Sequence, residues 1–140
     1  TSLFNSCLKH LLMTIFGIGN DIIEIERIRS SLTQYGQRFL DRLFTPQEQL
    51  YCLGHQDPAI RFAGRFAAKE AIVKALGTGF TQGVTWLDIE ILNDPKGKPE
   101  ARLSTRLQKQ MGAMHVLLSI SHCREYASAV ALIKSCPATS

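Results

Sequence analysis

The sequence predicts an α+β fold in which an antiparallel sheet packs against one long central helix. Three observations support this class. Residues 15–23 are apolar and β-branched, residues 58–76 lie between a helix-start signal and a glycine, and strand-like segments return in the second half of the chain. A chain of 140 residues is long enough for one domain with its own core.

The first predicted strand spans residues 15–23 and contains Gly17 and Gly19. A glycine inside a strand marks a close backbone approach or a bulge. The next segment, residues 24–43, has a helical pattern that is broken near Gly36. We therefore expect a strand that leads directly into an interrupted helix.

Two helix-start signals follow. Residues 45–48 (TPQE) combine a capping threonine, a proline at the first helical position and a glutamate that completes a capping box. That short helix ends near Gly54. Asp57, followed by a proline, opens the long helix 58–76 by the same logic, and Gly77 closes it. This helix is about 28 Å long.

The second half is predicted to contain strands and one helix. Leu87, Ile89 and Ile91 alternate with Asp88 and Glu90, a pattern typical of a half-buried strand. The predicted elements are a strand over 86–92, a turn over 93–97, a strand over 100–103, a helix over 104–111 that stops at Gly112, and two strands over 116–121 and 126–133.

Composition and charge limit the classes of function. The net charge of +4 suits an acidic macromolecule or a polyphosphate, and it is too mild to indicate a nucleic-acid binder. No apolar stretch approaches the roughly 20 residues that cross a bilayer, so we expect no membrane contact. The cysteines, Cys7, Cys52, Cys123 and Cys136, lack paired spacing, which favours unpaired thiols in a reducing cytoplasm.

The carboxylates of Asp21 and Glu70 are the first candidate functional groups. Glu70 and Lys74 share a face of the long helix, either as a surface salt bridge or as functional groups. The apolar residues around them favour function, because a carboxylate there needs a partner or a cation. Asp21 either caps the helix that begins near Glu24 or binds metal. Two carboxylates from separate elements suit magnesium, which keeps several waters.

Two further patterns are less specific. Gly77, Thr78 and Gly79 form either a helix C-cap with a flexible turn or a loop that presents N–H groups to phosphate. His122, at a strand end, either binds an anion or satisfies a loop carbonyl. Ser121 beside it is not read as a nucleophile, because neighbours on a strand point apart and the chain has no GxSxG motif.

Five blocks resemble the holo-[acyl-carrier-protein] synthase family in the same order. Residues 65–71 (RFAAKEA), continued by 74–79 (KALGTG), look like the central signature of that family. Residues 17–24 (GIGNDIIE), followed by Arg27 and Ile28, resemble its opening. The other blocks are residues 86–91 (WLDIEI), 97–99 (GKP) and 119–122 (SISH), so that the resemblance covers about residues 14–133.

The resemblance implies a 4′-phosphopantetheinyl transferase fold over residues 13–134, with 1–12 as an N-terminal extension and 135–140 as a tail. It implies that the phosphopantetheine arm of coenzyme A moves to a serine of apo acyl carrier protein, releasing adenosine 3′,5′-bisphosphate, in fatty acid biosynthesis. It also implies magnesium dependence, a cytoplasmic location and a homotrimer with active sites between subunits.

The roles of individual residues follow from the matched motifs. Asp21 and Glu70 are the expected magnesium ligands, and with Lys74 they are the candidate catalytic residues. Glu70 is also the first choice of general base for the serine proton. Lys74 is expected to contact the coenzyme A phosphates, and Arg65 and His122 are expected to bind the nucleotide end. The coenzyme A cleft is expected to be lined by Gly77, Thr78 and Gly79. The carrier protein is expected to dock near Arg27.

One departure from the family pattern and three alternative functions stay open. Residues 54–57 contain no Lys or Arg, where some relatives have basic residues, so a nucleotide contact is missing or is supplied elsewhere. One alternative is a relative with a broader carrier range, although such relatives often contain two similar halves. The others are a nucleic-acid-binding module, for which residues 27–42 lack an aromatic platform, and a non-catalytic subunit that docks carriers.

Overall fold

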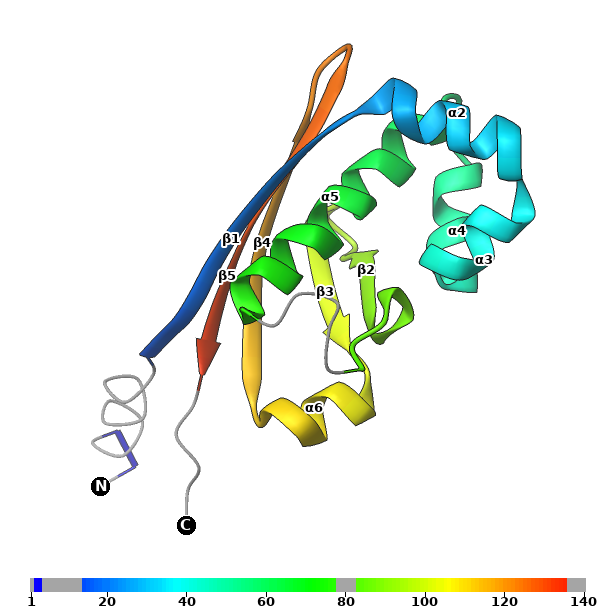
Figure 1. Ribbon diagram of the computed structural model, residues 1–140. Coiled ribbons are helices and arrows are strands. Elements are labelled where there is room, and N and C mark those ends of the chain that lie inside the picture. Colours follow the sequence, from blue (N-terminus) through cyan, green and yellow to red (C-terminus); the bar gives the residue numbers. More distant parts are fainter. Residues whose placement is uncertain (1, 4–13, 78–82, 136–140) are drawn as a thin grey trace.

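The computed structural model describes residues 2–3, 14–77 and 83–135. It confirms the α+β class, with an antiparallel sheet of β1, β5 and β4 packed against helix α5 (Figure 1). The elements are β1 (Thr14–Glu24), α2 (Ile25–Tyr35), α3 (Gln37–Leu43), α4 (Pro46–Leu53), α5 (Pro58–Leu76), the 3-10 turn η1 (Trp86–Asp88), β2 (Ile89–Asn93), β3 (Pro99–Leu103), α6 (Thr105–Met111), β4 (Met114–His122) and β5 (Tyr126–Ser135).

Helix α5 crosses one face of the sheet from β4 to β1. Near its start, a Cβ at Gly64 would lie 3.1 Å from the Ile120 side chain of β4. Further along, Ala71 and Ala75 lie against β1. Since β5 is the middle strand, β1 and β4 are the two edges of this sheet in the described residues. The two halves of α5 therefore face opposite edges.

Gly17 and Gly19 allow β1 to approach α5 closely. A Cβ at Gly17 would lie 2.0 Å from the carbonyl oxygen of Ala75, and a Cβ at Gly19 would lie 2.0 Å from that of Ala71. The β1–β5 register also shifts between Ile15 and Gly17. The close approach and the bulge that a strand glycine predicts are both confirmed.

The helices of the first half follow their local signals, with one exception. Gly36, at φ 55, separates α2 from α3, and Thr45 and Glu48 form the reciprocal capping box that opens α4. The helix start predicted at Asp57 is confirmed, but the expectation that its side chain caps α5 is wrong. Asp57 occupies the N-cap position, but its carboxylate accepts hydrogen bonds from Arg29 at 2.8 and 3.1 Å.

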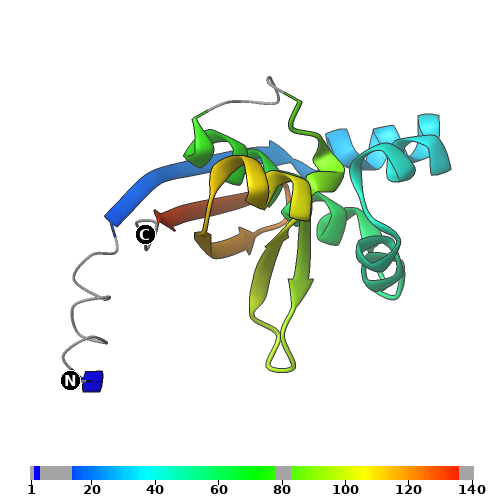
Figure 2. The same ribbon diagram turned by 90° about the horizontal axis from the view of Figure 1, so that it is seen from below.

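The strand predicted over 86–92 begins three residues late, because Trp86–Asp88 forms η1. Asp88 is buried and Leu87 is exposed, which reverses the predicted alternation. The Asp88 carboxylate can be buried because it accepts hydrogen bonds from Thr85, Ser104 and Arg106. Beyond η1, strands β2 and β3 form a hairpin that projects away from the sheet (Figure 2).

The core has two apolar clusters, and α5 contributes to both. One cluster lies between the second half of α5, the sheet and the hairpin, and the other lies between the first half of α5 and helices α2 to α4. The expectation that this helix is buried on much of its circumference is confirmed. Among the described residues, no helix combines the length and apolarity that crossing a membrane requires.

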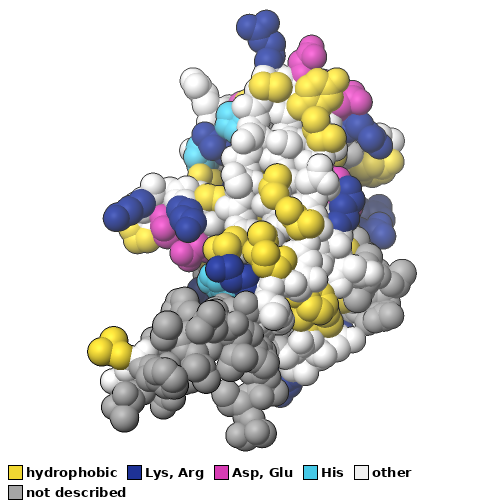
Figure 3. Space-filling model, turned by 90° about the vertical axis from the view of Figure 1, so that its left-hand side faces the viewer, with side chains coloured by type: hydrophobic (Ala, Val, Ile, Leu, Met, Phe, Trp, Pro, Cys, Tyr) yellow, Lys and Arg dark blue, Asp and Glu magenta, His cyan; other side chains and the backbone are white. Residues whose placement is uncertain are grey.

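The sheet face that points away from α5 carries exposed apolar side chains. Ile18, Leu132 and Leu117 form one row across β1, β5 and β4. Ile18 is 68% exposed and Ile22 is 66% exposed. Hydrophobic side chains spread along this side of the molecule (Figure 3). An apolar face of this kind marks an interaction surface rather than ordinary solvent-facing sheet.

Candidate active site

Asp21 and Glu70 lie in the same hollow, next to Lys74. The hollow has a volume of about 470 Å³ and is formed between β1, α2, α3 and α5. Asp21 points toward α5 because it shares the inward face of β1 with Gly17 and Gly19, while Ile18 and Ile22 point outward. We call this space the carboxylate hollow.

The charges of the carboxylate hollow interact directly. The Lys74 Nζ lies 3.1 Å from Asp21 Oδ1 and donates to the backbone carbonyl of Asn20 at 3.0 Å. Burial, followed by the negative charge of Asp21, raises the pKa of Glu70 above its usual value. Lys74 thus forms its ion pair with Asp21, so the surface salt bridge considered for Glu70 and Lys74 is not the one observed.

The structure excludes the interpretation of Asp21 as the cap of α2. The N-cap of α2 is Glu24, and no side chain caps that helix. Asp21 therefore has no capping role at this helix start. Among the described residues, no group of three His, Cys, Asp or Glu side chains is arranged around a common metal position. Asp21 and Glu70 would hold a metal ion as a pair, which fits the few protein ligands that magnesium takes.

The wall of the carboxylate hollow is apolar and aromatic, which the sequence did not predict. Ile28, Phe39 and Phe66 line it, together with the exposed Arg27. Phe66 stacks on Trp86 with ring centroids 4.9 Å apart. In sequence these aromatic residues look like ordinary core positions, so no local signal distinguishes them.

Arg65 and His122 meet in a second space, which we call the cationic hollow. It has a volume of about 160 Å³, and Arg61, Tyr51 and Asn93 also line it. None of its described lining residues is acidic. It lies where the first half of α5 faces the end of β4 and the β2–β3 turn.

Arg65 is held firmly in the cationic hollow. It is only 5% exposed, its guanidinium lies 4.1 Å from the Tyr51 ring centroid, and its Nη2 donates to Asn93 Oδ1 at 2.5 Å. Its buried Nε has no hydrogen-bond partner within the described residues. A buried N–H group in that state is a donor suited to an anionic ligand.

The predicted site residues therefore fall into two groups within one chain. Asp21, Glu70 and Lys74 line the first hollow, and Arg65 and His122 line the second. The two hollows have no lining residue in common. Gly77 ends α5 at φ 79 and has the left-handed conformation expected of a C-cap. Thr78 and Gly79 lie outside the described residues.

Comparison with known proteins identifies the family. The model of the 4′-phosphopantetheinyl transferase superfamily matches residues 17–131. The chain belongs to this superfamily. A relative from Protochlamydia amoebophila (strain UWE25), named holo-[acyl-carrier-protein] synthase, is 60% identical over 119 residues, which are 85% of this chain and 98% of the relative.

Solved structures of superfamily members share the fold. The holo-[acyl-carrier-protein] synthase of Helicobacter pylori, in complex with coenzyme A, matches with a TM-score of 0.77 at 34% identity, covering 83% of this chain and 98% of that one. The synthase of Bacillus anthracis str. Ames, in complex with CoA (3′,5′-ADP), matches with a TM-score of 0.74 at 42% identity, covering 86% and 97%. The resemblance seen in the sequence is thereby confirmed.

Proposed function

We propose that this protein transfers the 4′-phosphopantetheine group of coenzyme A to a serine of apo acyl carrier protein, giving holo carrier protein and adenosine 3′,5′-bisphosphate. The observation that carries this proposal is the meeting of Asp21, Glu70 and Lys74 in one hollow. The similar proteins named holo-[acyl-carrier-protein] synthase, and the two similar structures with coenzyme A or its nucleotide, support the same reaction.

We further propose that Asp21 and Glu70 bind magnesium. Their carboxylates share one hollow, and the charge of Asp21 contributes to the raised pKa of Glu70, so a cation between them would relieve that repulsion. When bound there, magnesium supplies positive charge to the diphosphate oxygens of coenzyme A. Lys74, whose Nζ lies beside Asp21, would contact the same phosphates and neutralise charge that develops in the transition state.

Glu70 is our candidate for the general base. In the proposed step, Glu70 takes the proton of the carrier serine while the serine oxygen bonds to the phosphorus that carries the pantetheine arm. The bond from that phosphorus to the bridging oxygen breaks, and adenosine 3′,5′-bisphosphate leaves with the electron pair. A carboxylate whose pKa is raised by burial is a stronger base than an ordinary glutamate, which favours this role.

The nucleotide end of coenzyme A is proposed to bind in the cationic hollow, through Arg65 and His122, with residues 77–79 along the cleft. The guanidinium of Arg65 has no acidic neighbour among the described lining residues, and its buried Nε–H is unpaired, which matches a phosphorylated ligand. This assignment requires one coenzyme A molecule to contact both hollows.

A homotrimer would bring the two hollows together. Asp21 lies on the edge strand β1 and His122 on the opposite edge strand β4, both toward the same end of the sheet. If the β1 side of one copy meets the β4 side of the next, the contact is head-to-tail, and a rotation of one third of a turn between copies closes it into a ring of three. The apolar outer face, with Ile18 and Ile22, offers the surface that three copies would bury (Figure 3).

We propose that the acidic carrier docks near Arg27. Arg27 is exposed, lies at the rim of the carboxylate hollow, and forms no ion pair with another described residue. Its neighbour Arg29 is instead occupied by Asp57 and Glu26. A cytoplasmic location, where apo carrier and coenzyme A are both present, completes this proposal.

The direct test incubates the purified protein with apo acyl carrier protein, coenzyme A and magnesium, and weighs the carrier by mass spectrometry. A gain equal to one phosphopantetheine arm is expected, and no gain with Glu70→Gln. A carrier that stays apo under all conditions would refute the proposal. Repeating the assay with peptidyl carriers of secondary metabolism tests the broader range kept as the alternative.

A further inference from the structure

Arg61 is a further charged residue of the cationic hollow. It lies on α5 one turn before Arg65, so the two side chains share a helical face. It is half-buried and lines the hollow, yet it makes no hydrogen bond or ion pair with another described residue. Arg65, by contrast, is fixed by Asn93 and Tyr51.

The segment before α5 supplies no positive charge to this hollow. Residues 54–57 contain no Lys or Arg. His55 is bonded through Nδ1 to the Tyr51 carbonyl at 2.8 Å, and Asp57 is paired with Arg29. The permanently charged side chains available to a ligand in the cationic hollow are therefore Arg61 and Arg65 of α5.

The size and charge of the hollow indicate which part of a ligand it takes. At about 160 Å³ it is smaller than the roughly 300–1,000 Å³ typical of pockets for whole ligands, so it fits a fragment such as one phosphate group. A phosphate monoester carries a charge of about −1.5 to −2 at neutral pH. The planar forks of arginine side chains match its oxygens. In coenzyme A, the monoester is the phosphate on the ribose of the adenosine.

We propose that Arg61 binds this ribose phosphate and makes the protein selective for coenzyme A over dephospho-coenzyme A. The inference rests on the proposed placement of the nucleotide end at Arg65 and His122, and it adds a residue that the motifs did not indicate. Arg61 would be the cation that compensates for the absence of Lys and Arg from residues 54–57.

The test measures dissociation constants of coenzyme A and dephospho-coenzyme A by calorimetry, using the full chain with magnesium. Arg61→Gln should weaken coenzyme A binding about tenfold, as loss of a charge-assisted hydrogen bond does, and should change dephospho-coenzyme A binding much less. Arg61→Lys keeps the charge and should recover part of the loss. Lys109→Gln, on the exposed surface of α6, is the control for net charge.

The outcomes distinguish the role of Arg61 from the placement of the nucleotide end. Equal weakening of both ligands by Arg61→Gln, or no weakening of either, overturns the role of Arg61. His122→Ala separates the inference from the proposal beneath it. If His122→Ala weakens coenzyme A binding and Arg61→Gln does not, the nucleotide placement stands and the Arg61 inference fails. If neither change has an effect, the placement itself fails. Circular dichroism must show that each variant is folded.

Discussion

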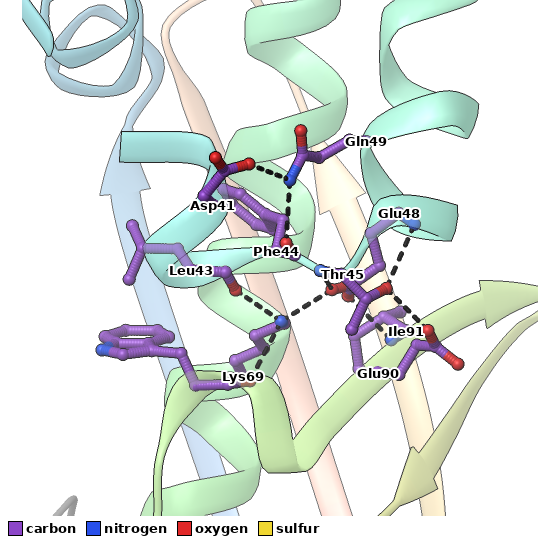
Figure 4. Close-up of polar contacts among 10 residues, drawn as sticks. Asp41, Leu43, Phe44, Thr45, Glu48, Gln49, Lys69, Glu90 and Ile91 are labelled. Carbon is purple, nitrogen blue, oxygen red and sulfur yellow. Dashed lines mark hydrogen bonds and ion pairs between the residues drawn. The ribbon is translucent and has the colours of Figure 1, made fainter. Parts of the chain in front are cut away.

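Lys69 and Glu48 form an ion pair in which both side chains are completely buried, with Nζ 2.8 Å from Oε1 (Figure 4). The Lys69 ammonium also donates to the carbonyls of Leu43 and Trp86, at 2.6 and 3.1 Å. The other oxygen of Glu48 accepts from the Ile91 amide at 2.8 Å. One pair of charges thus joins α3, α4, α5, η1 and β2.

Replacing Lys69 by Met should destabilise the protein by about 3–5 kcal/mol, because it leaves the Glu48 carboxylate buried without a counter-charge. The double variant Lys69→Met with Glu48→Gln should recover much of that loss, since no charge then remains in the core. Urea unfolding of the three proteins measures the difference. If the single and double variants were equally unstable, the pair would be less important than the packing around it.

Gly19→Ala should destabilise the fold strongly. The new Cβ would lie 2.0 Å from the Ala71 carbonyl oxygen and 2.7 Å from the Ala75 amide nitrogen. Because both are backbone atoms, β1 must move away from α5, at a cost of at least about 3 kcal/mol. The matched control is Gly54→Ala, whose Cβ would approach no atom closer than 3.4 Å. That change should alter stability by less than about 1 kcal/mol. Equal melting temperatures for the two variants would contradict this packing.

Glu70→Gln should raise the melting temperature of the metal-free protein at pH 7. The folded state raises the pKa of Glu70, chiefly by burial, so folding is opposed when this carboxyl ionises. The penalty is absent below the pKa of the unfolded chain, and it develops as the pH rises through the raised pKa. The gain from Glu70→Gln should therefore vanish below about pH 4, under the ordinary pKa of a glutamate, as calorimetry with a chelator can show. A gain that is independent of pH would argue against a raised pKa.

Arg27→Glu should raise the Michaelis constant for the carrier and leave that for coenzyme A nearly unchanged. The substitution reverses a charge at the rim of the carboxylate hollow, where it would steer an acidic partner. The effect should shrink as salt is added, because exposed charges are screened. Steady-state kinetics at several salt concentrations provide the measurement. A salt-independent effect, or an equal change for both substrates, would exclude docking by charge at Arg27.

Local signals allowed most of the fold to be predicted. The capping box of Thr45 and Glu48 and the helix end at Gly77 depend on residues a few positions apart, so the sequence contains all the information needed. The two errors came from partners distant in sequence. Arg29 takes the Asp57 carboxylate away from the helix start. Ser104 and Arg106 bind the carboxylate of Asp88 and allow its burial, although Asp88 had looked like the solvent side of a strand.

The residues of the candidate site were predicted from the sequence, but their arrangement in space was not. The family motifs indicated Asp21, Glu70 and Lys74, and the fold brings them together because two glycines let β1 lie against α5. No periodicity separates Lys69, which is buried in the core, from Lys74, which reaches the hollow. Nor could the sequence reveal that Arg65 and His122 line a separate hollow, since this depends on how α5 crosses the sheet.

We propose that the carboxylate hollow of one copy works with the cationic hollow of another. Co-expressing an Asp21→Asn, Glu70→Gln variant with an Arg65→Gln, His122→Ala variant tests it most directly. Each variant alone should be inactive. In mixed trimers, each hollow is intact in half of the chains, so about one quarter of the shared sites should be restored. Recovered transfer of phosphopantetheine at that level would support the account. Mixed oligomers of confirmed composition that remain inactive would contradict it.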